Sequence, residues 1–164
     1  MNNEEILAQL QERFPGAVVE VPELTDFTVV VAPERLIEVA TFLRDEAGFD
    51  YLANLTSVDW PERFEVVYHL YSIKNGAAQP FVLKVYLPDK ENPEVPSVVG
   101  IWPTANYQER EVYDLMGIRF PGHPNLKRIM LWEGFPGHPL RKDFENRPYT
   151  YEELEPTRPK GPAW

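Results

Sequence analysis

Hydrophobic residues in the first 100 positions recur with two periods, every second residue in some segments and every third or fourth in others. The first period is typical of strands and the second of amphipathic helices. Residues 18–21 and 27–31 are rich in β-branched side chains, which favours strands. A first helix is expected to be capped by Asn3 and to end before Pro15-Gly16, and a strand is expected at residues 51–58. A second helix is expected from Pro33 to Gly48, with an apolar stripe of Leu36, Val39, Ala40, Leu43 and Ala47.

The clearest pair of strands lies at residues 64–73 and 81–87, which flank a loop that contains Asn75-Gly76. Asn-Gly is a strong turn signal between alternating segments. Combined with the helices, this pair predicts an α+β fold with an antiparallel or mixed sheet and packed helices. The residues expected on the buried face are Phe64, Val66, Tyr68 and Leu70 of the first strand and Phe81, Leu83, Val85 and Leu87 of the second.

Regular structure is expected to become sparse toward the C-terminus, where 12 of the 17 prolines lie from Pro88 onward. A helix is predicted at residues 104–116, with Thr104 as its N-cap and Gly117 as its C-terminal stop. From Ile118 the chain is expected to form turns. The predicted organisation is a single α+β domain over residues 1–143, made of an acidic body (1–100) and the helix with its turns (101–143), followed by an irregular, extended C-terminal tail (144–164).

Charge and composition exclude several classes of protein. The chain of 164 residues has a net charge of -10, which disfavours nucleic acid as a partner. It has no cysteine, so disulfides, thiolate nucleophiles and cysteine-ligated clusters are excluded. No glycine-rich phosphate-binding loop is present, which disfavours a dinucleotide or NTP site. The N-terminus resembles no secretory signal and no apolar run is long enough to span a membrane, so we expect a soluble intracellular protein.

A metal site is one candidate for chemistry on this chain. His123 and His138 could converge with Glu111 or Asp114 as nitrogen and oxygen ligands. Each of these histidines sits in a Gly-His-Pro turn, however, where an imidazole more often bonds a nearby backbone carbonyl or carboxylate. His69 is interpreted as a packed or cross-strand residue. The three serines at 57, 72 and 97 have no nucleophile-elbow context, so hydrolytic catalysis is disfavoured.

The predicted helix at 104–116 carries a dense cluster of charges. Glu109, Arg110, Glu111 and Asp114 lie within two turns, and Arg110 and Asp114 are four residues apart, so they could form an ion pair. Such a cluster either decorates a solvated face or forms a polar contact with another protein. The sequence leaves both interpretations open.

The tail is too poor in apolar residues to fold by itself. Burial of its five large apolar side chains would contribute about 10 kcal/mol, whereas ordering 21 residues costs about 20 kcal/mol or more in backbone entropy. The tail is therefore either an extended segment that binds across the surface of another protein or a flexible terminus. The large apolar residues are Phe144, Tyr149, Tyr151, Leu154 and Trp164, of which Tyr149, Tyr151 and Trp164 are the predicted anchors.

Residues 96–143 resemble a known family. The run Glu109-Arg110-Glu111-x-x-Asp114-Leu115-Met116, then His123, then Lys127-x-Ile129-Met130, is similar to the signature of the C-type subunit of NADH-quinone oxidoreductase (respiratory complex I), the mitochondrial 30 kDa subunit family. The flanking sequences agree with this resemblance: Pro96-Ser97-Val98 and Ile101-Trp102-Pro103-x-Ala105-Asn106 before it, and residues 137–143 after it.

The resemblance implies a hydrophilic subunit of the peripheral arm that carries no flavin, no iron–sulfur cluster and no NADH site. FMN and the clusters would belong to partner subunits. The implied partners are the D-type subunit, which holds the quinone site, and adjacent iron–sulfur subunits. Membrane association would be indirect, at the cytoplasmic face of the cell membrane in a bacterium. No catalytic residue is implied; the residues assigned to structure and interface are Glu109, Arg110, Glu111, Asp114, His123, Lys127, Arg141, Lys142 and Asp143.

Two alternatives remain beside this interpretation. Related subunits occur in membrane-bound hydrogenases and other quinone-reducing complexes, and the motif does not separate these from an NADH-linked enzyme. The other alternative is a free-standing metal-dependent enzyme that uses His123 and His138.

Overall fold

A mixed five-stranded sheet forms the centre of the computed structural model, which describes residues 1–76 and 79–154. Its strands lie in the order β1-β2-β5-β4-β3, and all neighbours are antiparallel except β2 and β5, which are parallel. The predicted α+β class and mixed sheet are confirmed. The strands are β1 (Val18–Glu20), β2 (Thr28–Val31), β3 (Tyr51–Asp59), β4 (Phe64–Tyr71) and β5 (Phe81–Leu87).

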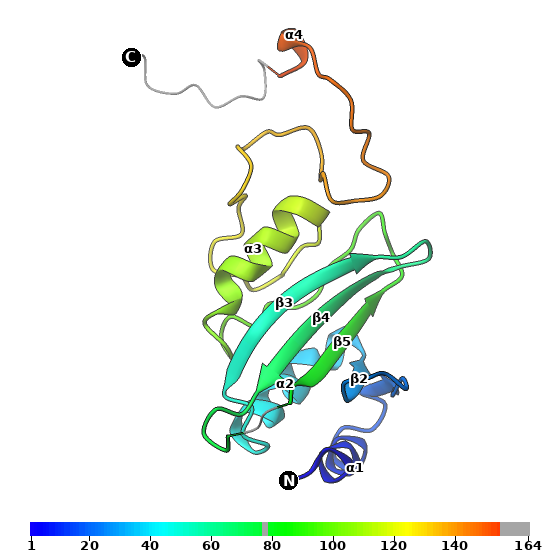
Figure 1. Ribbon diagram of the computed structural model, residues 1–164, viewed down its shortest axis with the longest axis vertical. Helices are drawn as coiled ribbons and strands as arrows, with labels where there is room; N and C mark the ends of the chain where they lie inside the picture. The colour runs from blue at the N-terminus through cyan, green and yellow to red at the C-terminus, as the bar shows by residue number, and fades with distance from the viewer. Residues whose placement is uncertain (77–78, 155–164) are drawn as a thin grey trace.

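Four α-helices accompany the sheet in the described part of the chain: α1 (Asn3–Arg13), α2 (Leu36–Asp45), α3 (Ala105–Met116) and the single turn α4 (Tyr151–Leu154). A 3-10 turn at Pro33–Arg35 leads into α2. In Figure 1, α2 lies behind the sheet and α3 runs beside β3 at one edge. None of the described helices combines the length and hydropathy needed to cross a bilayer.

The first helix is capped by Asn2 rather than by Asn3, so that prediction was wrong by one residue. The Asn2 side chain accepts a hydrogen bond from the Glu5 N–H at 2.8 Å, and the Glu5 carboxylate accepts one from the Asn2 N–H at 2.9 Å. This reciprocal pair satisfies two backbone donors at the helix start. Asn3, one position later, already belongs to the helix.

The predicted core face of the central strands is confirmed. The alternate residues expected in the core from Phe64 to Leu70 of β4 and from Phe81 to Leu87 of β5 are all buried, and they join the apolar side of α2 in one cluster. Each buried side chain of this size contributes about 1.5–3 kcal/mol by leaving water. The period of two in the sequence was sufficient to identify them, because one face of the sheet is the core.

The helix α3 is fastened to the free edge of β3 by side chains. The Gln108 side-chain oxygen accepts a hydrogen bond from the Leu55 N–H at 2.6 Å. Thr104 is the N-cap residue, but its hydroxyl donates to the Leu52 carbonyl at 3.2 Å instead of capping the helix. Gly117 ends the helix in the left-handed conformation, with φ of 71°, as predicted.

Beyond Ile118 the described chain consists of turns, as expected, apart from an isolated bridge and the turn α4. Residues 119–121 run beside residues 93–97, joined for example by the Val95 N–H donating to the Arg119 carbonyl at 3.0 Å. The short α4 was not predicted. The Glu153 carboxylate caps it by accepting from the Thr150 N–H at 2.8 Å, and pairs with Arg147.

Candidate functional site

Asp114 lies at the C-terminal end of α3 and holds a distant turn of the chain. Its side chain is fully buried, and one carboxylate oxygen, Oδ2, accepts hydrogen bonds from three successive backbone N–H groups: Ile129 at 3.1 Å, Met130 at 2.7 Å and Leu131 at 2.9 Å. The other oxygen, Oδ1, accepts from Arg128 Nη1 at 2.9 Å. One side chain thus fixes the backbone of the 128–131 turn.

Arg128 extends this arrangement to the next turn. Its side chain is only 11% exposed, and its Nη2 donates to the carbonyls of Phe135 and Gly137, both at 3.0 Å. The predicted ion pair between Arg110 and Asp114 was wrong. Arg110 instead donates to the carbonyls of Lys127 and Arg128, so the carboxylate and the guanidinium both bind residues 127–131 rather than each other.

The last four backbone carbonyls of α3 have no donor among the residues of the helix itself, and each is bound by a group that follows the helix in the chain. The Tyr113 carbonyl accepts from the Gly117 N–H, and the Leu115 carbonyl from the Leu140 N–H at 3.0 Å. The Asp114 carbonyl accepts from Arg128 and from His138 Nδ1, and the Met116 carbonyl from Arg141 Nε at 2.6 Å. Cationic groups are favourable at this end of the helix dipole. Residues 118–144 therefore form a cap over the end of α3.

Gly117 is required by this cap for two reasons. Its positive φ is strained for other residues, and a Cβ there would lie 2.6 Å from His138 Cδ2 and 2.9 Å from Arg141 Nη2. Any side chain at this position would therefore displace both groups from the end of the helix.

The surroundings of Asp114 and His138 determine whether each side chain is charged. Burial alone would raise the pKa of Asp114, but the three N–H donors and Arg128 outweigh it and hold this pKa below its usual value. Burial lowers the pKa of His138, and the neighbouring Arg128 and Arg141 lower it further. The imidazole of His138 is therefore neutral near pH 7 and donates from Nδ1.

The two histidines of the metal-site hypothesis are engaged by backbone groups. His123 Nε2 donates to the Asn106 carbonyl at 2.9 Å, while its Nδ1 accepts from the Asn125 N–H at 2.9 Å. His138 bonds the Asp114 carbonyl. Among the described residues, no three His, Cys, Asp or Glu side chains are grouped as metal ligands. The third histidine, His69, is a cross-strand residue in β4, as interpreted from the sequence.

Glu109 is fully buried, so its carboxylate neither belongs to a solvated face nor contacts another protein, the two interpretations of the charged cluster that the sequence left open. Its Oε2 accepts from the Ser97 hydroxyl and its Oε1 from the Val98 N–H, both at 2.7 Å. Burial raises the pKa of Glu109 to about 7, although these two donors oppose the rise. The nearby Tyr68 hydroxyl is buried and has no partner within the described part of the chain, and burial followed by the charge of Glu109 raises its pKa.

Asp59 provides a second attachment for the C-terminal part of the cap. Its Oδ2 accepts from the Lys142 N–H at 2.9 Å and its Oδ1 from Lys90 Nζ at 2.5 Å. Burial opposes ionisation of this carboxyl, but Lys90 and the Lys142 N–H hold its pKa below the usual value. The carboxylate at the end of β3 thus joins residues 90 and 142, which are far apart in sequence.

Replacement of Asp59 by alanine is expected to reduce the free energy of unfolding by about 1–3 kcal/mol, because it leaves a backbone donor and a lysine without their acceptor. Chemical denaturation of the full chain measures this change. Replacement of Asp143, an exposed carboxylate next to Lys142, is the matched control and should change stability by less than about 0.5 kcal/mol. Equal values for the two variants would contradict the attachment.

The remaining predicted interface residues lie on the surface. Glu111 and Asp143 are exposed, as is Lys127, whose backbone carbonyl alone is bound, by Arg110. In the tail, the Tyr149 hydroxyl donates to the Glu145 carbonyl at 3.3 Å and Tyr151 is exposed. The third predicted anchor, Trp164, lies outside the described residues.

Three important residues were missed by sequence reasoning: Arg128, Asp59 and Lys90. Arg128 follows Lys127 in a segment without periodicity, so nothing marked it as the partially buried member of the pair. Asp59 ends a strand just before the Pro61 turn, which is a common position for a solvated carboxylate. Its partners are contributed by residues that are remote in sequence, and no local pattern could reveal them.

These contacts define a small α+β protein in which a turn-rich segment is fastened over the end of one helix. Comparison with known protein families gives a match to residues 29–150, the family described as "Respiratory-chain NADH dehydrogenase, 30 Kd subunit". The chain belongs to this family. The resemblance seen in the sequence is therefore confirmed.

The relatives cover nearly all of the fold. The chain is 50% identical to the C-type subunit of NADH-quinone oxidoreductase from Moorella thermoacetica, over 84% of this chain and 92% of that protein. It is 48% identical to the corresponding subunit of a Roseiflexus species, over 87% and 84%. A solved trypsin-resistant fragment of Nqo5 matches with a TM-score of 0.63 and 38% identity, over 77% of this chain and all of the fragment. A chain of the membrane-bound sulfane sulfur reductase, an archaeal respiratory membrane complex, matches with a TM-score of 0.67 and 32% identity, over 87% and 85%.

Proposed function

We propose that this chain is a peripheral-arm subunit that scaffolds electron transfer from NADH through iron–sulfur clusters to quinone, while carrying no flavin, cluster or NADH site itself. As a subunit of NADH-quinone oxidoreductase, it would act as part of an enzyme without an active site of its own. The observation that carries this proposal is the cap at the end of α3. Its polar groups are directed at the chain's own backbone, so they shape a surface rather than assemble a reactive centre.

The outer surface of the cap is suited to contact with other proteins. Met130 and Leu140 are 64% and 61% exposed, and Ile129 is also exposed. Large apolar side chains on a rigid backbone, beside the exposed cations Lys127 and Lys142, are typical of a protein interface. The proposed partners are the quinone-site (D-type) subunit and adjacent iron–sulfur subunits, which would attach this chain indirectly to the cytoplasmic face of the membrane.

Native electrophoresis tests this proposal. The chain is tagged at its N-terminus in the native host, the membranes are solubilised gently, and the tagged species are separated and identified by mass spectrometry. Co-migration with iron–sulfur and quinone-site subunits is the expected result. A band of the free chain alone, absent from membranes, would contradict the proposal. Stoichiometric zinc, iron or manganese in the purified chain would instead support a metal-dependent enzyme using His123 and His138.

A specific observation supports a second candidate function. The similarity to a chain of the membrane-bound sulfane sulfur reductase shows that this fold also occurs in a respiratory complex of a different name. The chain would then serve an equivalent complex, such as a membrane-bound hydrogenase, with another electron donor. The same experiment separates the two candidates, because the co-migrating subunits identify the electron-input module.

Deletion of residues 145–164 is expected to leave the body folded while preventing stable incorporation into the complex. Phe144 is retained in this variant because it stacks on Phe135 at 6.2 Å and belongs to the cap. The melting temperature of the isolated variant should match that of the full chain, whereas its share in the native complex should fall at least about tenfold. Normal incorporation of the variant would show that residues 145–164 are not needed to attach the chain to the complex.

A further inference from the structure

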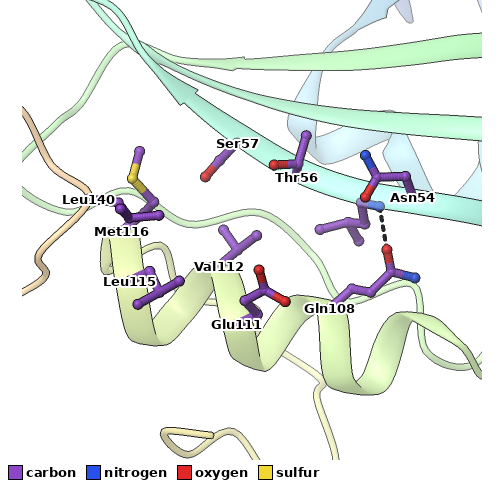
Figure 2. A pocket seen from close by; sticks show the side chains of 10 residues that line it. Asn54, Thr56, Ser57, Gln108, Glu111, Val112, Leu115, Met116 and Leu140 are labelled. Carbon is purple, nitrogen blue, oxygen red and sulfur yellow. Dashed lines mark hydrogen bonds between the residues drawn. The ribbon is translucent and has the colours of Figure 1, made fainter. Parts of the chain in front are cut away.

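A small groove lies between the free edge of β3 and the helix α3. Residues 54–57 of the strand form one wall, the 108–116 face of the helix forms the other, and Leu140 of the cap closes one end. We refer to this space as the β3–α3 groove. Figure 2 shows that the side chain of Glu111 extends from the helix toward the strand between Gln108 and Val112, with Met116 and Leu140 beyond.

The size of the β3–α3 groove determines what it can hold. Its volume is about 90 Å³. A buried apolar cavity of about 150 Å³ binds benzene, and pockets for small molecules and cofactors have roughly 300–1,000 Å³. The groove is therefore too small for a quinone ring, a flavin or a nucleotide. It fits one narrow, unbranched side chain.

The chemistry of the groove favours a cation. Glu111 has no hydrogen bond or ion pair with any described residue, whereas the other two carboxylates of α3, Glu109 and Asp114, are fully engaged. The carboxylate lies beside apolar walls contributed by Val112 and Met116. A carboxylate beside apolar side chains, in a groove whose strand wall also carries the polar side chains of Thr56 and Ser57, complements a long side chain with a methylene stem and a charged end.

The strand supplies a second acceptor. The Leu55 N–H points away from β4, because it donates to Gln108 on α3. Alternate residues of an antiparallel strand direct their backbone groups to the same edge, so the backbone of Ser57 also faces the groove. None of the described contacts outside the sheet uses the Ser57 carbonyl.

We propose that the β3–α3 groove receives one lysine or arginine side chain from a neighbouring subunit of the complex. The methylene stem lies against Val112, Met116 and Leu140, and the charged end binds Glu111. This inference rests on the proposed function, since it requires an assembled partner, and it assigns a role in assembly to a residue that does not stabilise the isolated chain. Positive charge on the partner also complements the net charge of -10 on this chain.

The test compares Glu111→Gln with the wild type in the whole complex. Both chains are expected to incorporate, but the variant should dissociate at least about tenfold faster in a salt series, because its partner's cation loses its carboxylate. Glu12→Gln on α1, where the carboxylate is likewise exposed and far from the groove, is the matched control and should behave as the wild type. Release of Glu111→Gln at the wild-type rate would overturn the inference.

Two further measurements separate the possible failures. If the wild-type chain itself does not enter a complex, the proposed function fails; if it enters and Glu111→Gln is released normally, only the groove inference fails. The melting temperature of the isolated Glu111→Gln chain should equal that of the wild type. A clear decrease would show that Glu111 acts within this chain and would also overturn the inference.

The absence of native cysteine allows a second, independent readout. Leu140→Cys places one thiol at the end of the groove, and a maleimide should label it rapidly in the free chain but at least about tenfold more slowly in the complex. Glu12→Cys, labelled at similar rates in both states, is the control. Equal labelling of Leu140→Cys in both states would show that nothing covers the groove and would contradict the inference.

Discussion

Replacing Asp114 by alanine is expected to reduce the free energy of unfolding by about 3–5 kcal/mol, which is a large effect for a single substitution. The change would leave Arg128, which is largely buried, without its carboxylate, and would remove the acceptor of three backbone N–H groups. Unsatisfied buried donors and an unpaired buried charge are both strongly unfavourable. Urea denaturation of the full-length chain measures the loss.

The same substitution should loosen the cap before the whole protein unfolds. Trypsin cleaves after Lys127 and Arg128, and we expect cleavage there to become much faster when Asp114 no longer holds the turn. Glu111→Ala on the same helix is the control, since its exposed carboxylate has no partner in the described chain and should change stability by less than about 0.5 kcal/mol. A loss below about 1 kcal/mol for Asp114→Ala would show that the turn is held by other contacts.

The buried carboxyl of Glu109 should make stability depend on pH in the opposite direction to ordinary acid denaturation. Its pKa is about 7 in the folded chain against 4.5 as the usual value, so the folded state binds the proton more tightly than the unfolded state. The favourable contribution is therefore fully present below about pH 4.5 and is lost as the pH rises through 7. This difference corresponds to about 3 kcal/mol.

Glu109→Gln isolates this effect. The difference in free energy of unfolding between wild type and variant should change by about 3 kcal/mol, to the disadvantage of the wild type, as the pH rises from about 4.5 to about 8. His138, whose lowered pKa destabilises the fold as the pH falls below 6.5, is present in both chains and cancels. The lowered pKa of Asp114 matters only at lower pH. A difference that does not vary with pH would mean that Glu109 titrates as an ordinary carboxyl.

The central strands and α2 could be predicted because each has one apolar face and one polar face. Alternation in residues 64–71 and 81–87 identifies the residues of the core face without knowledge of the sheet, although Glu65, Val67 and Val82 on the opposite face are buried as well. Gly117 was equally predictable, since a left-handed residue is required at the end of a helix. In each case the physical constraint is local.

The burial of Glu109 was overlooked although a local signal existed. The buried stripe of α3 includes Ala105, Glu109, Val112 and Met116, at spacings of four, three and four residues. Glu109 therefore occupies a core position in the helical period, but both interpretations of the charged cluster placed it at the protein surface. Asp114 offered no comparable signal, because the turn that it binds lies 15 or more residues away and its donors are backbone groups, which have no sequence signature.

One oxygen of Asp114 fixes the conformation of the 128–131 turn through backbone groups, so the shape of this part of the cap does not depend on its side chains. Asp114 binds only the backbone of residues 129–131, so the conformation there does not depend on which side chains those positions carry. The side chains of Ile129 and Met130, which are exposed, are thereby held in position by contacts in which they take no part. A surface built in this way has its shape before any partner arrives, which reduces the conformational entropy lost on binding.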